Sequence, residues 1–334
     1  MNRPIRYLAA AAAFAASSAL SGSAAAQSGD ASPTAWTAPR TADGQPNFQG
    51  HWTNDTYTPL ERPAELGDKA TFTPEEAEAF LASRVDELNG QSADDIHYDD
   101  AIWQAENYSK VAHLRTSLVL DPRNGRLPAL TARGQDRLPR QRATQRATSA
   151  DSAQSRSLAE RCISWGNVGP PMVPPTYNAN LQILQNRDLV VISHEMMHDV
   201  RTIYLDGRAH PSPSIQWLAG HSIGHFEGQT LVVDTTNFTP FTNFRGSPQN
   251  TRQDIFASEH LHVVERFTLT GDDSIHYAFS VDDPETWVAP WSGEMDIRRT
   301  EGPIFEYACH EGNLGLANIL RAARVADAQA LRRD

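Results

Sequence analysis

The sequence contains few cysteines, no excess of positive charge and only one long apolar run. Two of its 334 residues are cysteine, too few for a small disulfide-rich scaffold. The formal net charge is −12, which argues against non-specific binding to nucleic acid or to an anionic membrane. After the N-terminal run, no segment approaches the length of a membrane span. We therefore expect a soluble protein that does not bind nucleic acid and does not insert stably into a membrane.

The first 26 residues have the pattern of a secretory signal peptide. Arg3 and Arg6 supply positive charge, Leu8–Leu20 is apolar, and Ala24–Ala26 offers a cleavage site. An uncleaved membrane anchor is the alternative, but the apolar run is rich in alanine and ends in polar residues. Removal of the leader takes the formal charge from −12 to −14 and leaves 308 of the 334 residues. We predict a bacterial protein that is exported to the periplasm or secreted.

The two cysteines, Cys162 and Cys309, are expected to form a disulfide in such an oxidising compartment. The bond would close a loop of 147 residues, worth roughly 4 to 5 kcal/mol in the chain-entropy model. Two separately buried thiols are the alternative. A cysteine nucleophile is disfavoured, because the neighbouring His310 is adjacent in sequence and this does not bring its imidazole to the sulfur.

The chain divides into a leader, a lead segment, an extension and a strand-rich region, although one domain with appendages is as compatible with its length as two domains. The extension holds a predicted helix at 74–88, which Thr73 and Glu76 begin with a capping box and Asn89–Gly90 ends. It also holds an arginine-rich segment, for which we predict a solvated helix or linker. The predicted parts are a signal peptide at 1–26, a flexible lead at 27–39, an N-terminal extension at 40–160 and a β-barrel domain at 161–334.

Short runs of alternating apolar and polar residues dominate the second half of the chain. Turn residues separate them at Asn186–Arg187, Asp206–Gly207, Glu227–Gly228 and Gly271–Asp273. A meander of this kind must remove its edges, so we predict a mainly β protein whose antiparallel strands close into a calycin-like or lipocalin-like barrel, followed by a helix at 314–331. Strands are predicted at Phe48–Thr53, Arg115–Leu120, Leu181–Gln185, Leu189–Glu195, His198–Leu205, Ile215–Phe226, Thr230–Thr236, His260–Leu269, Ser274–Val281 and Met295–Tyr307.

The string His194–His198 spells the H-E-x-x-H pattern of zinc peptidases. That pattern works only on a helix, where the two imidazoles lie about 6 Å apart. Its flanks, Asp188–Ser193 and Val200–Leu205, are rich in β-branched residues and predict a β-hairpin. Four residues of continuous strand would separate His194 from His198 by roughly 13 Å, too far to share one zinc ion. We therefore expect no cofactor and keep a zinc hydrolase using these two histidines as a minor alternative.

Three polar residues in this hairpin, Glu195, His198 and Arg201, form the main candidate site. Buried unpaired, such groups would cost several kcal/mol, so we expect them either to pair with one another or to face a cavity. Glu195 would orient His198 as a general base, and Arg201 would stabilise developing negative charge. The alternative is a structural ion cluster that locks the hairpin.

Seven of the twelve histidines lie between residues 194 and 262. Strand alternation places His221 and His225 on one face, so both are added as candidate catalytic residues. His260 and His262 share a second face. Two further candidates for the rim of a pocket are His310–Glu311 and the tryptophan-containing loop Trp287–Trp291, which suits an aromatic or carbohydrate ligand or simply covers the barrel end.

Several strings together resemble an uncharacterised family of exported bacterial proteins with no assigned activity. The resemblance covers most of the mature chain and implies export and a β-rich fold. It also implies that Glu195 and His198 matter more to the family pattern than His194, which further disfavours zinc. The strings are Phe48–Asn54, Arg115–Leu118, Glu195–His198, Leu205–Arg208, Gly228–Phe238 and Tyr307–Asn313.

These observations predict a periplasmic enzyme that acts on a small organic molecule by acid–base hydrolysis or elimination, without a metal. A non-catalytic calycin-like protein that binds a small molecule is the alternative from a different class, and an H-E-x-x-H zinc hydrolase is the third. Convergence of Glu195, His198 and Arg201 with His221 or His225 in one accessible cavity would favour the enzyme.

Overall fold

The computed structural model describes residues 36–56, 58–89, 114–145, 150–165, 169–174, 178–241, 243–245 and 254–332. The range 37–334 forms one compact unit. The predicted signal peptide and the acidic run 94–100 lie outside the described residues. Within the described part of the chain, no helix combines the length and the apolar character needed to cross a bilayer.

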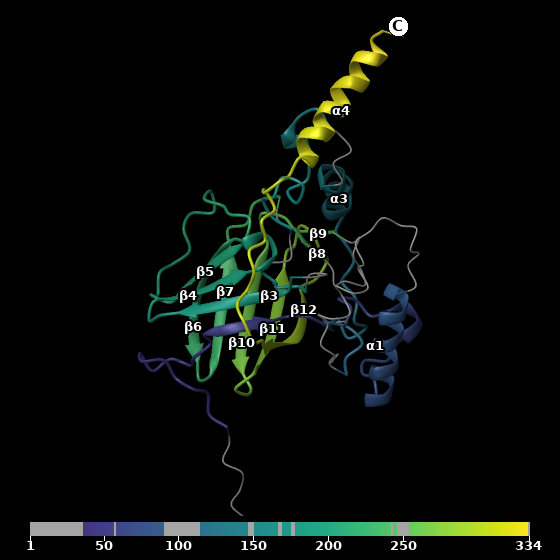
Figure 1. Cartoon of the computed structure of the whole chain (residues 1–334). Helices are drawn as coiled ribbons and strands as arrows, with labels where there is room; N and C mark the ends of the chain where they lie inside the picture. The colour runs from purple at the N-terminus through teal and green to yellow at the C-terminus, as the bar shows by residue number, and fades with distance from the viewer. Residues whose placement is uncertain are drawn as a thin grey trace, which may run out of the picture. The chain divides into compact units, whose positions relative to one another are not determined.

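Nine of the described strands close into a barrel, which confirms the predicted mainly β fold with an N-terminal and a C-terminal helix (Figure 1). Closure occurs at β1, which pairs with β3 on one side and with β12 on the other. In the order of their pairing, the nine strands are β1 (Gly50–Thr53), β3 (Asn180–Gln185), β4 (Leu189–His194), β5 (Val200–Tyr204), β6 (His221–Glu227), β7 (Thr230–Thr236), β10 (His262–Leu269), β11 (Ser274–Asp282) and β12 (Trp291–Arg299).

The barrel takes strands from both halves of the chain. β1 and β2 (Val119–Asp121) belong to the segment predicted as an N-terminal extension, yet β1 closes the barrel and β2 pairs with β12. A division at residue 161 therefore does not separate the barrel from what precedes it. The remaining short strands, β8 (Asn243–Arg245) and β9 (Asp254–Phe256), pair with each other as a separate ribbon.

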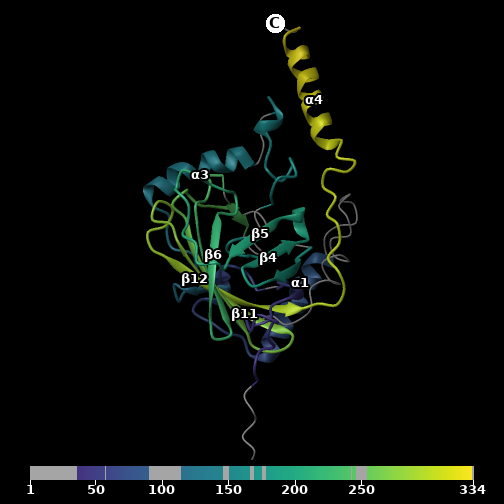
Figure 2. The same ribbon diagram turned by 90° about the vertical axis from the view of Figure 1, so that its left-hand side faces the viewer.

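One connection departs from the predicted antiparallel meander. β5 and β6 are parallel neighbours, with Ile203 opposite Ser222 and Tyr204 opposite Ile223. In the turned view of Figure 2, β6 lies to the left of β4 and β5. Parallel neighbours need a connection that returns the chain to the starting end of the sheet. Residues 205–220, called the crossover below, make this return. The turn at Asp206–Gly207 therefore opens the crossover and does not close a hairpin, and the strand predicted from Ile215 begins only at His221.

Large apolar side chains fill the barrel interior. Alternation along each strand points every second residue inward, as in β10 and β11, where Phe267 and Tyr277 are buried with ring centroids 4.9 Å apart. Trp291 is also buried at the start of β12, four residues before the predicted strand began at Met295. The largest fully buried side chains are Trp52, Trp291, Tyr277, Phe48, Phe238, Phe267, Leu60, Leu118, Met172, Leu181 and Ile183.

The helices form where the sequence predicts them. α1 (Pro74–Asn89) begins with the expected reciprocal cap, in which Glu76 N–H donates to Thr73 Oγ1 over 3.3 Å and Thr73 N–H donates to Glu76 Oε2 over 2.8 Å. α3 (Ala132–Gln145) carries part of the arginine-rich segment, which runs from Arg115 to Arg161, and its Arg133 and Arg137 pair with Glu285. These two arginines thus have a structural role, because their charges join α3 to Glu285. α4 (Gly315–Ala330) buries none of its residues.

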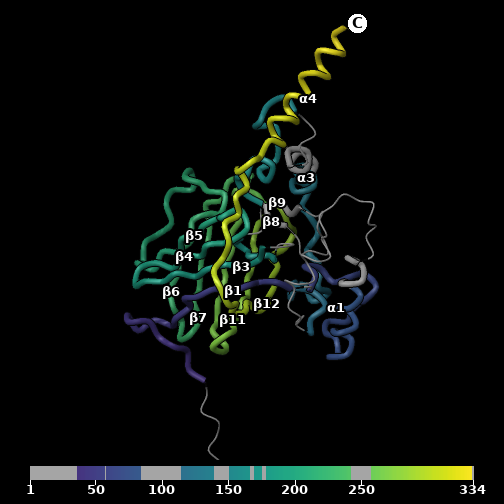
Figure 3. The backbone as a smooth tube through the Cα atoms, viewed as in Figure 1, coloured from purple at the N-terminus to yellow at the C-terminus, as the bar shows by residue number. Residues whose placement is uncertain are grey.

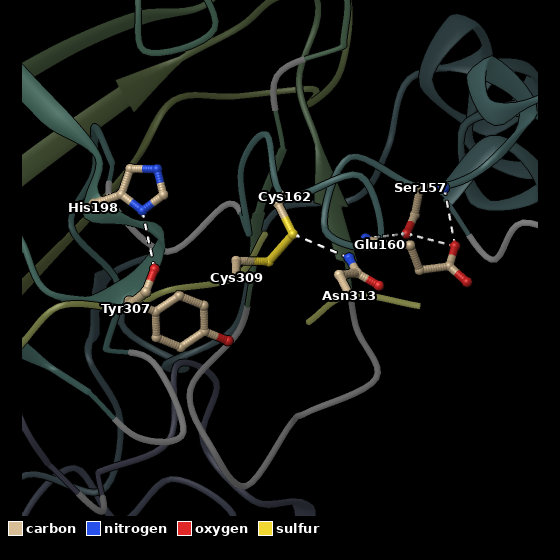
Figure 4. Close-up of a disulfide and its surroundings, with 7 residues drawn as sticks. All are labelled: Ser157, Glu160, Cys162, His198, Tyr307, Cys309 and Asn313. Carbon is tan, nitrogen blue, oxygen red and sulfur yellow. Dashed lines mark hydrogen bonds between the residues drawn. A yellow bond between two sulfur atoms is a disulfide. The ribbon is translucent and has the colours of Figure 1, made fainter. Parts of the chain in front are cut away.

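Residues 300–314, called the C-terminal strap, connect β12 to α4. Figures 1 and 3 show this segment in yellow, running along the outside of the barrel. The strap is fastened by the disulfide between Cys162 and Cys309, which confirms the predicted pairing (Figure 4). Asn313 Nδ2 also donates to Cys162 Sγ over 3.4 Å. Residues 300–307 were predicted to continue the last strand, but β12 ends at Arg299 and the strap runs on as irregular chain.

Candidate functional site

The H-E-x-x-H string connects two strands and forms no α-helix. β4 ends at His194, the chain turns through Met196–His198, and β5 begins at Val200. Met197 and His198 have φ values of 58° and 46°, in the left-handed region that breaks a right-handed helix. The β-hairpin predicted from the flanks is therefore present, and the helical geometry that a zinc peptidase needs is not.

His194 and His198 lie in opposite environments. His194 is buried, and its Nε2 has no hydrogen-bond partner among the described residues. Burial lowers its pKa to about 3, with a smaller contribution from the charge of Arg201. His198 is exposed, and its Nδ1 lies 3.1 Å from the carbonyl oxygen of Tyr307 in the strap (Figure 4). Among the described residues, no group of three or more His, Cys, Asp or Glu side chains could hold a metal ion.

Glu195 is buried beside the strap and fastens it. Its carboxylate accepts hydrogen bonds from Asn178 Nδ2 at 2.6 Å, from Asn180 Nδ2 at 3.4 Å and from the backbone N–H of Phe305 in the strap at 2.9 Å. The charge of Glu195 also helps to raise the pKa of Asp55 to about 7, although burial of Asp55 is the main cause. Glu195 therefore does not orient His198; both residues of the motif contact the strap at different points.

Arg201 points into the barrel and joins a buried network. Its guanidinium pairs with both carboxylate oxygens of Glu265, and the Arg201 and Glu265 side chains are 4% and 0% exposed. Arg201 Nε also donates to Ser222 Oγ at 3.0 Å, and Nη2 donates to Thr235 Oγ1 at 3.1 Å. Tyr277 Oη donates to Glu265 Oε1 at 2.8 Å. These five residues, called the interior network, come from the adjacent strands β5, β6, β7, β10 and β11.

The predicted set of Glu195, His198 and Arg201 is thus divided among three places. Arg201 belongs to an ion cluster with Glu265 of β10, and not to a cluster with Glu195 and His198, because its donors meet acceptors from neighbouring strands. Paired in this way, a buried charge is tolerated in a low-dielectric interior. The three side chains do not form one catalytic constellation.

The outer faces of the same strands carry a second polar network. His221 Nδ1 lies 2.9 Å from His210 Nδ1, His210 Nε2 lies 3.0 Å from Asp234 Oδ1, and His262 Nε2 lies 3.0 Å from Asp234 Oδ2. We call these four residues the outer chain. Unlike the interior network, they are partly open to solvent, since the side chains of Asp234 and His262 are 42% and 41% exposed.

Strand register explains how three of these residues meet. On β7, Asp234 lies opposite Ile223 of β6 and Val264 of β10. His221 and His262 each lie two residues from those partners, so both are diagonal neighbours of Asp234 on one face of the sheet. His225 is on the same face but two residues beyond Ile223 in the other direction, where it is exposed and contacts Glu227. Of the predicted pair, His221 belongs to the outer chain and His225 does not.

The crossover supplies the fourth residue, His210, together with aromatic neighbours. The ring of His221 stacks on Tyr204 with centroids 5.3 Å apart and contacts Trp217 of the crossover at 5.5 Å. The Arg208 guanidinium lies 3.8 Å from the centre of the Tyr204 ring, on which it can form a cation–π contact. Two aromatic rings, of Tyr204 and Trp217, therefore flank His221, the first histidine of the outer chain.

The pKa values of the two end histidines shift in opposite directions. Partial burial lowers the pKa of His221, and the nearby His210 and Arg208 add to this. The hydrogen bond to Asp234 raises the pKa of His262, and the charges of Asp234 and Asp282 act in the same direction. The bond to His262 also lowers the pKa of Asp234. The Asp234 carboxylate thus lies between two parts of the outer chain whose histidines, His221 and His262, have pKa values shifted down and up, respectively.

Sequence reasoning missed His210 and Asp234. Asp234 was visible as a charged residue in the strand Thr230–Thr236, where alternation turns it to the side opposite Val233 and Thr235. His210 gave no such signal, because a parallel return was not predicted for the segment after Asp206–Gly207. Its contact with His221 depends on where the crossover lies.

The other candidate residues lie apart from the outer chain. In the tryptophan-containing loop, Trp287 and Trp291 are both buried and meet edge to face at 5.7 Å, so they cover the barrel end instead of offering an open stacking surface. His260 faces Glu285 at 3.7 Å, separate from the outer chain. His310 and Glu311 are exposed in the strap.

Comparison of the chain with protein-family models, with curated proteins and with solved structures found no match.

Proposed function

We propose that this protein is an enzyme that acts on a small organic molecule by acid–base chemistry at the outer chain, with His221 as the general base and His262 as the general acid. The single observation that carries the proposal is the continuous contact from His221 through His210 and Asp234 to His262. Acid–base enzymes commonly separate the pKa values of two neighbouring titratable groups. The opposite shifts of His221 and His262 fit that arrangement.

One hydrogen-bonding order of the outer chain would leave the basic lone pair of His221 on Nε2. The Asp234 carboxylate is ionised and can only accept, so His210 donates from Nε2. In this order His210 accepts at Nδ1, and His221 donates from its own Nδ1. The lone pair of neutral His221 is thereby left on Nε2, the atom that would take a proton from a substrate. Once His221 is protonated, its positive charge is stabilised through His210 by Asp234.

His262 would supply the matching proton. Its Nε2–H bonds to Asp234 Oδ2, so the cation keeps a second N–H at Nδ1. In a hydrolysis, His221 would take a proton from the attacking water and His262 would protonate the leaving group. In an elimination, His221 would take the proton from carbon instead. Both reactions use the same two proton transfers.

The barrel interior is less suited to the alternative of a lipocalin-like carrier. Trp52, Phe267 and Tyr277 fill the interior, and each is at most 1% exposed. A ligand inside the barrel would have to displace such side chains, at a cost of several kcal/mol. The aromatic residues around His221 instead favour an aromatic or other planar substrate at the outer face, where Trp217 is 41% exposed.

We propose that this enzyme works in the bacterial periplasm or outside the cell. The signal-peptide pattern of residues 1–26 and the Cys162–Cys309 disulfide support this location, because disulfides persist in oxidising compartments.

Incubation of a periplasmic metabolite pool with the wild-type protein and with His221→Gln tests the proposal. We expect at least one compound to be consumed by the wild type and not by the variant. His225→Gln is the matched control, because His225 lies on the same strand and face but contacts only Glu227 among the charged groups described around it. Equal consumption by wild type and His221→Gln, or by none of the three proteins, would refute the proposal. Glu195→Gln tests the competing assignment, in which the hairpin carries the chemistry.

A further inference from the structure

The outer chain depends on irregular backbone at one point. His221, Asp234 and His262 are held by paired strands, whereas His210 lies in the crossover. Apart from one parallel bridge between Trp217 and Phe238, the crossover lies outside the strand ladders, and such a segment holds its position through individual contacts. The anchor of the crossover therefore decides whether His210 stays between His221 and Asp234.

Asn237 provides that anchor directly after β7. Its Nδ2 lies 2.9 Å from the carbonyl oxygens of Ser212 and Ile215 and 3.4 Å from that of Pro211, all in the crossover. Its Oδ1 accepts from Thr236 Oγ1 at 2.7 Å. The side-chain amide thus binds the inner side of the crossover just beyond His210.

The backbone of the same residue makes a second attachment. The carbonyl oxygen of Asn237 accepts from Trp217 N–H at 3.0 Å, and Thr239 N–H donates to the Trp217 carbonyl at 3.0 Å. Asn237 adopts φ 61°, a left-handed conformation that asparagine tolerates better than most residues. Asn237 is also buried. Asn237 joins β7, which carries Asp234, to the segment between His210 and Trp217.

We infer that Asn237 is the positioning residue of the outer chain, holding the crossover so that His210 bridges Asp234 and His221. The inference deepens the proposed function and rests on it for its catalytic meaning. Without the amide, the crossover loses its contacts to three carbonyls, while the strand-borne contact between Asp234 and His262 remains. Removal of the Asn237 amide should therefore change the surroundings of His221 and leave those of His262 as they are.

The test is a pH titration of the imidazole resonances by NMR in wild type and in Asn237→Gly, which keeps the left-handed backbone and removes the amide. We expect the pKa of His221 to rise toward its ordinary value, because the ring loses the covering crossover and the neighbouring His210. The pKa of His262 should stay raised. If neither value moves, the inference is overturned. If His262 also loses its shift, Asn237 supports the barrel in general, and the inference is overturned as well.

Asn178→Gly is the matched control. Asn178 is also a left-handed asparagine, with φ 53°, and its amide donates to Glu195 at 2.6 Å, away from the outer chain. Its replacement should leave both His221 and His262 unchanged. A shift of His221 in this control as large as that in Asn237→Gly would count against a specific role for Asn237.

Amide hydrogen exchange gives an independent measurement. In Asn237→Gly, exchange at Ile215 and Trp217 should accelerate by about tenfold or more, and in Asn178→Gly it should not. Asn237→Asp, which cannot donate, should give the same acceleration if the glycine variant does not fold. Slow exchange in the folded variant would overturn the inference.

Turnover separates this inference from the proposed function. On a substrate found with the metabolite pool, Asn237→Gly should lower kcat by about tenfold or more with a smaller change in KM, and its pH profile should follow the altered pKa of His221. If His221→Gln leaves turnover intact while the NMR response of Asn237→Gly is as expected, the proposed function fails and the positioning of the crossover stands. If His221→Gln abolishes turnover and Asn237→Gly changes nothing, the proposed function stands and the positioning role of Asn237 is overturned.

Discussion

The interior network and the outer chain lie on opposite faces of the same strands β6, β7 and β10. Neighbouring residues serve the two networks: Ser222 faces in and His221 faces out on β6, and Thr235 faces in and Asp234 faces out on β7. The interior network is buried, with the charge of Arg201 paired to Glu265. The outer chain is partly exposed and contains histidines whose pKa values shift apart.

Under the proposed function, this difference separates a structural role of the interior network from a chemical role of the outer chain. A buried ion pair that loses one partner leaves an uncompensated charge in a low-dielectric interior, so the interior network contributes to stability and strand register. A half-exposed set of histidines contributes little to stability, because water screens its charges. In the proposed reaction, its protons are exchanged with a substrate.

The largest expected effect is on the interior network. Glu265→Ala leaves Arg201 buried without its carboxylate partner and Tyr277 Oη without its acceptor. We expect a loss of about 3 to 5 kcal/mol in the free energy of unfolding, measured by urea denaturation with circular dichroism. A loss below about 1 kcal/mol would mean that water reaches this pair and that it is not a buried structural bridge.

A double variant sharpens the same point. Arg201→Met combined with Glu265→Leu removes both charges and fills part of the volume, so the double variant should be more stable than the sum of the single losses predicts. We expect a coupling energy of about 1 to 3 kcal/mol from a double-mutant cycle in urea. Strict additivity of the two single effects would contradict direct pairing of Arg201 with Glu265.

The outer chain should respond in function and hardly in stability. Asp234→Asn removes the carboxylate between His210 and His262 but keeps the shape of the side chain. The free energy of unfolding should therefore change by less than about 1 kcal/mol. The pKa of His262 should fall toward its ordinary value, since Asp234 is the main cause of its rise. On a substrate identified with the wild type, turnover should drop by about 100-fold or more. Normal turnover together with the altered His262 titration would show that the outer chain is not catalytic.

The smallest effect is the dependence of stability on pH through His262. Its pKa in the folded protein is raised above the ordinary value of 6.5, so its stabilising contribution is complete below about pH 6.5 and is lost as pH rises through the raised pKa. Because the group is half exposed, the loss should stay under about 1 kcal/mol. Thermal unfolding from pH 6 to 9 should show this decline in wild type and a flatter curve in His262→Gln. If thermal stability depended on pH with the same slope in both proteins, His262 would not be the cause of the decline.

Much of the fold could be predicted because periodicity and caps are local signals. The strand at Thr230–Thr236 and the capped helix from Pro74 appear where the sequence predicts them. The parallel return before β6 could not be predicted, because a turn at Asp206–Gly207 is compatible with either a hairpin or a longer connection. The candidate site was predicted least well: His221 belongs to the outer chain, whereas Glu195 and His198 hold the strap.

By itself, the sequence determined the β-rich character, the nature of the 194–198 string as part of a hairpin, and the pairing of its two cysteines, because these follow from local patterns or from the absence of other partners. Only the tertiary structure decided which polar residues face each other. Arg201 meets Glu265, and His210 meets Asp234, across strands and a crossover whose register no local pattern encodes. Side-chain alternation assigns a residue to a face, but only the folded barrel determines which strands lie beside it.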